Sequence, residues 1–242
     1  MPWFFTDREI DADKYIIEGE TARHMLKSLR MKQGEELTLV TPSGIQLDCV
    51  LALASNDTAE VDIISRKTCE NEPDVKITLY QALPKGDKMD YIVQKCVELG
   101  ISEIVPVISA RCVSRPDEKS LRKKLLRWQK IALEAAQQSL RGIIPKIGAA
   151  LSFRQAVEKS KENELNIFFY ELGGESVAQI LTDKPKTIGF FIGSEGGFEE
   201  KEAQLAAEAG AKTATLGKRI LRAETAPLAA LSVIMYQTGN FD

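Results

Sequence analysis

The chain has 242 residues, of which 44% are hydrophobic and 28% charged, and its net charge at pH 7 is −3. This length and composition are those of an ordinary globular protein with one large or two modest domains, which excludes a disordered segment and a mini-protein. The four cysteines form no CxxC pair and the chain has one histidine. Neither a zinc site nor a disulfide framework is therefore indicated, and no metal is expected.

The beginning of the chain does not look like a targeting segment. Residues 1–15, MPWFFTDREIDADKY, carry acids where a signal peptide has a basic and then an apolar region. No apolar run reaches the length that spans a bilayer. The sequence predicts a cytoplasmic protein without a membrane partner.

Residues 1 to about 70 alternate short strand-like runs with turns that contain glycine and proline, such as residues 41–44 (TPSG). One helical stretch, from Glu20 to Leu29, interrupts the strands. The pattern predicts a small β-barrel or sandwich. A polar stretch from Lys67 to Asp74 follows it and is the candidate linker.

From Val75 onward, apolar strands alternate with helices, which predicts an α/β domain with a parallel sheet covered on both faces. The runs NIFFY and TIGFFI are apolar throughout, as expected for strands buried on both faces. The predicted helices are 88–99, 120–139, 153–159, 199–209 and a last one that begins at Ala226.

The last predicted helix has proline in its first turn and is apolar around almost its whole circumference. A helix of this kind needs cover on every side. We expect it to be wrapped by its own chain, by a second subunit, or by both.

Two loops near the carboxyl end carry the candidate chemistry. Residues 192–198 (IGSEGGF) connect a buried strand to a helix, and residues 217–225 (GKRILRAET) follow the next strand. The carboxyl ends of parallel strands meet at one edge of a sheet, so a crevice between these loops is the predicted pocket. One such loop by itself is more often an ordinary turn, whereas two at the same edge favour a binding site.

The loops also restrict the ligand. Neither contains GxGxxG or GxxxxGK[ST], and Glu195, Glu199, Glu200 and Glu202 crowd the beginning of a helix, where they would repel a phosphate. We therefore expect a neutral or cationic ligand. S-adenosyl-L-methionine is a nucleoside without phosphate that carries a positive sulfonium, and it fits this expectation; NAD and ATP do not.

Positive charge gathers between residues 111 and 146, where ten basic residues against three acids give a local net charge of +7, while the rest of the chain carries −10. A charged helix face is more often solvated than functional. The concentration nevertheless makes a candidate track for RNA phosphates. Its members on the predicted helix 120–139 and beside it are Arg111, Arg115, Lys123, Arg127, Lys130 and Arg141.

The histidine, His24, lies on the helix of the small domain beside three basic residues, Arg23, Lys27 and Arg30. A lone histidine is usually structural or merely exposed. An RNA-facing patch is the less common interpretation, and nothing in the sequence indicates a metal ligand.

The two loop sequences, GSEGGF at 193–198 and LGKRILRAETA at 216–226, resemble the signature loops of the ribosomal RNA small subunit methyltransferase E family. The resemblance spans the whole chain, and the second loop is its most specific element. Ser194 stands where the family usually has proline. Further matches are KGDKM at 85–89, VELG at 97–100, EAAQQS at 134–139 with Arg141 and Pro145, and His24, Leu29, Arg30 and Gly34.

The resemblance implies a SPOUT-class α/β methyltransferase domain over 74–242, with a parallel sheet and a C-terminal trefoil knot, and a PUA-like β-barrel domain for RNA docking over 1–70. It also implies a homodimer, S-adenosyl-L-methionine as cofactor, and 16S rRNA or the 30S subunit as partner. The implied cofactor-binding residues are Ile192, Gly193, Ser194, Glu195, Gly196, Gly197, Leu216, Gly217, Ile220, Leu221 and Thr225. The implied RNA-binding residues are His24, Arg30, Lys85, Lys88, Arg111, Arg127, Lys130 and Arg141.

The implied reaction is methylation of N3 of a uridine, whose proton must leave before N3 becomes a nucleophile. Arg222 stays protonated and is expected to stabilise the uracil anion rather than act as a base. Glu224 is the carboxylate of the second loop, but an ordinary glutamate is a weak base, so it is either a catalytic or a structural residue.

Three alternatives remain open. The nearest is another SPOUT RNA methyltransferase that acts on a ribose 2'-hydroxyl or on tRNA. A non-catalytic RNA-binding protein of the same fold would fail to bind S-adenosyl-L-methionine. A phosphate-dependent nucleotide enzyme would bind ATP or NAD, which the acidic loop disfavours.

Overall fold

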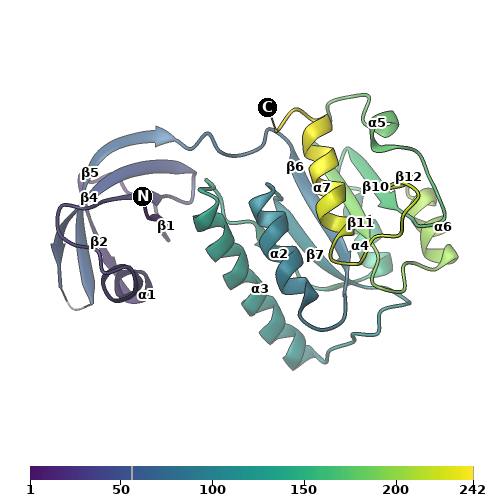
Figure 1. Cartoon of the computed structure of the whole chain (residues 1–242), viewed down its shortest axis with the longest axis horizontal. Helices are drawn as coiled ribbons and strands as arrows, with labels where there is room; N and C mark the ends of the chain where they lie inside the picture. The colour runs from purple at the N-terminus through teal and green to yellow at the C-terminus, as the bar shows by residue number, and fades with distance from the viewer. Residues whose placement is uncertain (56, 242) are drawn as a thin grey trace. The chain divides into compact units, whose positions relative to one another are not determined.

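The computed structural model describes residues 1–55 and 57–241 and divides the chain into two compact units (Figure 1). The first unit contains Met1–Glu72 together with Ala136–Ile143, and the second contains Pro73–Ala135 and Ile144–Asp242. Among the described residues, no helix combines the length and apolarity needed to cross a bilayer.

The first unit contains one five-stranded sheet in the order β1-β3-β4-β5-β2. Parts of β4 and β5 alternate buried and less buried residues, so one face of the sheet carries the core. Strand β1 runs parallel to β3, while the β3–β4, β4–β5 and β5–β2 pairs are antiparallel. The strands are β1 (Trp3–Phe5), β2 (Lys14–Glu18), β3 (Glu36–Val40), β4 (Ile45–Ala54) and β5 (Thr58–Thr68).

The helical stretch predicted over 20–29 is confirmed, with one difference. An α-helix, α1 (Gly19–Arg23), continues directly into a π-helical turn, η1 (His24–Ser28), and the turn ends before Arg30, whose φ is 55°. Met25 is buried against the sheet, whereas His24 and Arg30 are exposed.

The stretch predicted as a linker is more ordered than expected. Strand β5 extends through Thr68, and Glu72 accepts hydrogen bonds from the backbone N–H of Gly142 at 2.8 Å and from the Arg141 guanidinium at 3.1 Å. The indole N–H of Trp3 donates to the Arg141 carbonyl at 2.9 Å. These contacts make residues 136–143 part of the first unit, although they are distant from it in sequence.

The second unit contains the predicted parallel sheet, in the order β12-β10-β11-β6-β7-β8, with β9 paired to β7. Every strand pair in it is parallel. The strands are β6 (Lys76–Ala82), β7 (Glu103–Ile108), β8 (Lys146–Ile147), β9 (Leu151–Ser152), β10 (Leu165–Phe169), β11 (Thr187–Ile192) and β12 (Lys212–Ala214).

Six helices are described in this part of the fold, and five of them match the predicted helices to within two residues at their beginnings. The short α5 was not predicted. In Figure 1, α2 and α7 pack together in front of the strands. The helices are α2 (Lys88–Glu98), α3 (Glu118–Gln138), α4 (Phe153–Ser160), α5 (Val177–Ile180), α6 (Glu200–Glu208) and α7 (Ala226–Gln237).

Aromatic residues fill the core beside the sheet. The rings of Tyr80 and Phe191 stack with centroids 4.6 Å apart, and Phe198 lies 4.7 Å from Phe168 and 5.4 Å from Phe153. All except Phe153 are at most 1% exposed. Since Phe198 belongs to the loop after β11, the core holds one end of that loop.

Helix α7 is buried on one side and exposed on the other within the single chain. Leu231, Ile234 and Met235 are fully buried, whereas Val233 and Tyr236 are 39% and 66% exposed. Its own chain therefore supplies only part of the cover that its apolar sequence led us to expect.

Candidate functional site

The second unit contains a cavity of about 420 Å³ at the carboxyl edge of the parallel sheet. Three segments line most of it: the residues that end and follow β10, the loop after β11, and the loop between β12 and α7. Lys88, at the beginning of α2, and Ala226, at the beginning of α7, complete the lining. Because β10 lies between β11 and β12 in the sheet, all three segments emerge side by side. The predicted crevice between the two loops is thus present, with a third wall that the sequence analysis did not include.

The loop after β11, residues 193–198, is the first loop. Its turn is closed by a hydrogen bond of 3.0 Å from the Gly197 N–H to the Ser194 carbonyl, and Gly197 has a φ of +65°. A Cβ on Gly197 would fall 2.4 Å from a carboxylate oxygen of Glu171, and one on Gly196 would fall 3.1 Å from the Cβ of Arg111. The positive φ of Gly197 favours glycine there. A Cβ on Gly196 would require Arg111 to shift by a few tenths of an ångström.

Side chains of β6 and of the segment after β7 also hold the first loop. The amide of Gln81, at the end of β6, donates to the Gly193 carbonyl at 3.3 Å. The Arg111 guanidinium donates to the Gly196 carbonyl at 3.0 Å and lies 3.9 Å from Glu171. Ser194, at the position of the family proline, is 7% exposed, and its hydroxyl contacts the Arg111 carbonyl at 3.5 Å.

The four acidic residues at the beginning of α6 take different places in the structure. The Glu202 carboxylate accepts hydrogen bonds from the backbone N–H groups of Ala110 and Glu199, each at 2.9 Å, so it caps the helix. Of the four acids expected to repel a phosphate, Glu195 lines the cavity. Glu171, after β10, adds a carboxylate to the lining that the sequence analysis missed.

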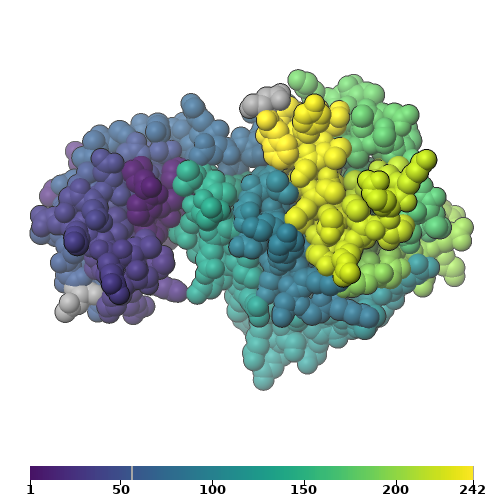
Figure 2. Space-filling view, viewed as in Figure 1, coloured from purple at the N-terminus to yellow at the C-terminus, as the bar shows by residue number. Residues whose placement is uncertain are grey.

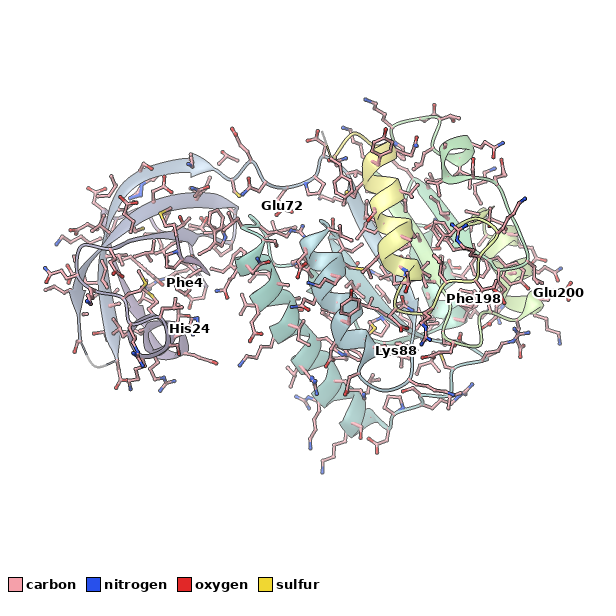
Figure 3. The ribbon with its side chains drawn as sticks, in the orientation of Figure 1. Phe4, His24, Glu72, Lys88, Phe198 and Glu200 are labelled. Atoms are coloured by element: carbon pink, nitrogen blue, oxygen red, sulfur yellow. The ribbon has the colours of Figure 1, made fainter. Side chains whose placement is uncertain are left out.

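Lys88 connects the two loops. Its ammonium lies 2.9 Å from the Glu195 carboxylate of the first loop and 3.0 Å from the Glu224 carboxylate of the second loop, residues 215–225. The backbone N–H of Lys85 also donates to both oxygens of Glu195, at 3.2 and 3.3 Å. Lys88 is the first residue of α2 (Figure 3), so the helix, the first loop and the second loop meet at this ion pair.

These contacts keep all three groups charged. Hydrogen bonds to Glu195 and then Glu224 raise the pKa of Lys88. Burial raises the pKa of Glu195, but hydrogen bonds from Lys88 and from backbone amides outweigh it and lower the pKa. The pKa of Glu224 is lowered by a hydrogen bond from its own backbone amide and by Lys88. A carboxylate with a lowered pKa is a poorer proton acceptor, which favours a structural role for Glu224 over that of a base.

Arg222 lines the cavity with an exposed side chain. Its carbonyl accepts hydrogen bonds of 2.9 Å from the backbone N–H groups of Thr225 and Ala226, which form the turn into α7. The backbone is thus fixed while the guanidinium is accessible from the cavity. The second loop and α7 form part of the molecular surface in Figure 2.

The structure brings ten of the eleven predicted cofactor residues together around the cavity. Thr225 is the exception, because it is exposed and caps α7 through its carbonyl, 3.0 Å from the Ala229 N–H. The cavity is also lined by four residues that were not predicted to hold the cofactor: Phe169, Tyr170, Glu171 and Arg219. The apolar run NIFFY predicts a buried strand. In a parallel sheet, the residues that follow this strand would lie at the same edge as the two loops, so the run could have pointed to this third segment. The ten residues are Ile192, Gly193, Ser194, Glu195, Gly196, Gly197, Leu216, Gly217, Ile220 and Leu221.

The predicted RNA-binding residues of the second unit fall into two groups. Lys88 and Arg111 are engaged at the first loop, as described above. Lys85, Arg127 and Lys130 are exposed, and Arg127 forms an ion pair with Asp90, which also accepts the indole N–H of Trp128 at 2.9 Å. A phosphate would therefore have to compete with Asp90 for Arg127.

Arg141 requires a correction. Its side chain is 3% exposed and is bound to Glu72, so it does not present a guanidinium to an RNA backbone in this structure. The predicted track of basic residues from Arg127 to Arg141 does not continue past α3, because the chain turns at Leu140, whose φ is 58°. Arg141 instead holds residues 136–143 in the first unit.

An RNA methyltransferase domain model matches residues 70–235, and an RNA methyltransferase PUA domain model matches residues 17–64. A relative from Bacillus subtilis, ribosomal RNA small subunit methyltransferase E, is 35% identical over 94% of this chain and 92% of its own length.

Two solved structures are similar along nearly the whole chain. The ribosomal RNA small subunit methyltransferase E of Neisseria gonorrhoeae, bound to S-adenosyl methionine, is 36% identical with a TM-score of 0.88, covering 98% of this chain and 97% of that one. A methyltransferase from Legionella pneumophila, with the same cofactor bound, is 29% identical with a TM-score of 0.89, covering 97% and 96%.

Proposed function

Because the chain belongs to the ribosomal RNA small subunit methyltransferase E family, we propose that it transfers a methyl group from S-adenosyl-L-methionine to N3 of a uridine in 16S rRNA. The observation that carries this proposal is the cavity at the sheet edge, which is lined by ten of the residues expected to hold the cofactor. Family membership supports the reaction class, and the cavity supports the location.

The cavity fits the cofactor in size and chemistry. Its volume of about 420 Å³ is within the range of small-molecule sites. Glycine backbone on one wall and apolar side chains such as Leu216 and Ile220 on the other suit a nucleoside. The carboxylate of Glu171 in the lining suits a ligand with a positive charge and hydrogen-bond donors. When bound, S-adenosyl-L-methionine supplies an electrophilic methyl group.

Arg222 is the residue that we assign to the chemistry. As the N3 proton leaves uracil, negative charge develops on the base, and the guanidinium in the cavity stabilises it. The first and second loops would hold the cofactor so that its methyl group is available to the N3 nucleophile that Arg222 stabilises. Glu224, held ionised by Lys88, orients the second loop, and the proton leaves to solvent.

The first unit is the proposed RNA-docking part. It contains the segment matched by the PUA model; His24 lies exposed on its helical turn and Arg30 lies exposed just after it. On the second unit, exposed Lys85, Arg111, Arg127 and Lys130 extend the proposed RNA contacts. The proposal keeps 1–70 as the docking domain and 74–242 as the methyltransferase domain.

Two features implied by the resemblance belong to the proposal as well. One is a trefoil knot that threads the chain at α7, and the other is a homodimer. The exposed apolar side of α7, with Val233 and Tyr236, supports a homodimer because a second copy would remove it from water. Since 16S rRNA is the proposed substrate, we place the protein in the cytoplasm.

The test is methylation of small-subunit rRNA taken from a strain that lacks this protein. The purified chain and labelled cofactor are added to naked 16S rRNA and to 30S subunits, and the product is mapped by mass spectrometry. The expected product is one N3-methyluridine in 16S rRNA. A label on a ribose 2'-hydroxyl or on tRNA, or no label although the cofactor binds, would contradict the proposal.

Arg222→Ala is the matched variant for this test. We expect cofactor affinity within a few fold of wild type and a fall in methyl transfer of about 100-fold, the size associated with one stabilising donor. Equal turnover by the variant and wild type would remove Arg222 from the mechanism.

A further inference from the structure

Lys88 occupies a position that neither an RNA contact nor an ordinary surface ion pair explains. Its ammonium is 2.9 Å from Glu195 and 3.0 Å from Glu224, and the three side chains are 32%, 28% and 23% exposed. The two carboxylates come from the two loops that face each other across the cavity, and Lys88 comes from a third element, α2.

We propose that Lys88 is a positioning residue that holds the first and second loops together around the methyl donor. This inference rests on the proposed function, since it assigns the cavity to S-adenosyl-L-methionine. Both carboxylates lie within 3.0 Å of one ammonium, so they lie within about 6 Å of each other and repel once the ammonium is gone. The loops then separate at the point where they should enclose the ligand.

Glu195 has an anchor besides Lys88, so the role of Lys88 is to hold the second loop onto the first. The backbone N–H of Lys85 donates to both of its oxygens, so Glu195 is fixed on the side of α2. Glu224 is in the second loop, where Leu216 to Arg222 carry several exposed side chains. Lys88 therefore fixes the less buried loop onto the more buried one.

The experiment measures binding of S-adenosyl-L-methionine and of S-adenosylhomocysteine, its neutral demethylated product, by calorimetry. Lys88→Met is expected to weaken both ligands by about tenfold or more, whereas Lys88→Arg retains most of the affinity. In Lys88→Met/Glu224→Gln, part of the loss is recovered because one repelling charge is absent. Glu224→Gln alone, which keeps Lys88, is expected to weaken both ligands by a smaller factor.

Comparing the two ligands distinguishes a positioning role of Lys88 from a direct electrostatic effect of its charge on the ligand. Removing a positive charge from the cavity would by itself strengthen binding of the cationic methyl donor and leave the neutral product unchanged. A parallel loss for both ligands therefore supports positioning. Tighter binding of the donor alone would overturn it.

Lys159→Met is the matched control. Lys159 pairs with Glu103 at 3.1 Å with a side chain 30% exposed, in the same unit but outside the cavity lining. We expect its ligand affinities to equal those of wild type. If both lysine variants lose affinity in proportion to a lowered Tm, the effect is one of general stability and the inference fails.

The pH dependence gives a signature that loss of stability would not produce. The groups that face Lys88 are Glu195 and Glu224, with Arg222 acting on Glu224 and the Lys85 amide on Glu195. The lowered carboxylate pKa values mean that wild-type affinity is flat near neutrality and falls in acid, as these groups become protonated. In Lys88→Met, affinity is expected to rise from pH 7 to pH 5, because protonation of one carboxylate relieves the repulsion.

The outcomes separate this inference from the proposed function. Wild-type protein that binds neither ligand contradicts the proposed function. Wild-type protein that binds both, with Lys88→Met and Glu224→Gln binding equally well, contradicts the positioning role alone. Unchanged ligand affinity with weakened 16S rRNA binding in Lys88→Met would make Lys88 an RNA contact instead, and would also overturn the inference.

Discussion

The two loops that line the cavity are held by different means. The first loop ends in the core through Phe198, which is 1% exposed, and packs between Arg111 and Glu171 at its glycines. The second loop has exposed residues from Gly217 to Ile220 and is tied by turn hydrogen bonds and by Glu224. The first loop is therefore a wall of the cavity that is held by packing, and the second loop is a wall that is positioned by an ion pair. Substitutions in the two loops should differ in their effects on stability and on cofactor affinity.

The largest effect is expected from Phe198→Ala. This change removes a ring that packs against Phe153 and Phe168, and a buried phenylalanine truncated to alanine costs about 3 to 5 kcal/mol of unfolding free energy. Urea denaturation measures the loss. A loss below about 1 kcal/mol would show that the first loop is not held by the core.

Gly197→Ala should come next and should act on binding more than on stability. The new Cβ would meet the Glu171 carboxylate, so that side chain has to shift, and the turn backbone is in the left-handed region, which is strained for alanine. We expect cofactor affinity to fall by about tenfold or more, which corresponds to at least 1.4 kcal/mol. Calorimetry with wild type and variant side by side measures this, and unchanged affinity would mean that the turn does not contact the cofactor.

Gly217→Ala is the matched substitution in the second loop, and its effect should be smaller. Gly217 also has a positive φ, of 93°, but a Cβ there would have no neighbour within 4 Å. Only the backbone cost of about 1 to 2 kcal/mol remains. If Gly217→Ala reduced affinity as much as Gly197→Ala, the proposed difference between the two walls would be wrong.

Ile220→Ser should change the free energy of unfolding least. Ile220 is 78% exposed, so the free energy of unfolding is expected to stay within about 0.5 kcal/mol of wild type. Thermal unfolding and calorimetry check this at low protein concentration. A large loss of stability would show that Ile220 is covered in solution, as contact with a second copy would cause.

Much of the fold was predictable because its signals are local. Continuous apolar runs such as TIGFFI indicated buried parallel strands, and the periodicity of residues 120–139 indicated α3. The first helical stretch was placed correctly, but its change into the π-helical turn His24–Ser28 was not. Short elements, namely β9 and α5, were missed because two to four residues carry too little pattern.

The candidate site was predictable where glycine and sequence order revealed it. The two loops could be identified from residues 192–198 and 216–225, and the rule for parallel sheets placed them at one edge. Glu171 was missed because a single glutamate after a strand has no distinguishing pattern. Arg141 was misassigned because a basic row was extended past the end of a helix, where the backbone turns and the side chain meets Glu72.

The sequence by itself determined the two kinds of architecture, the family and the two loops, because these depend on residue order and periodicity along the chain. Only the tertiary structure decided which charged side chains are available to bind a ligand. Lys88, Glu195 and Glu224 come from separate segments, and so do Glu72 and Arg141. Whether a charged side chain binds a ligand or another side chain depends on distances of a few ångströms between such segments, and these distances are set by packing of the whole fold.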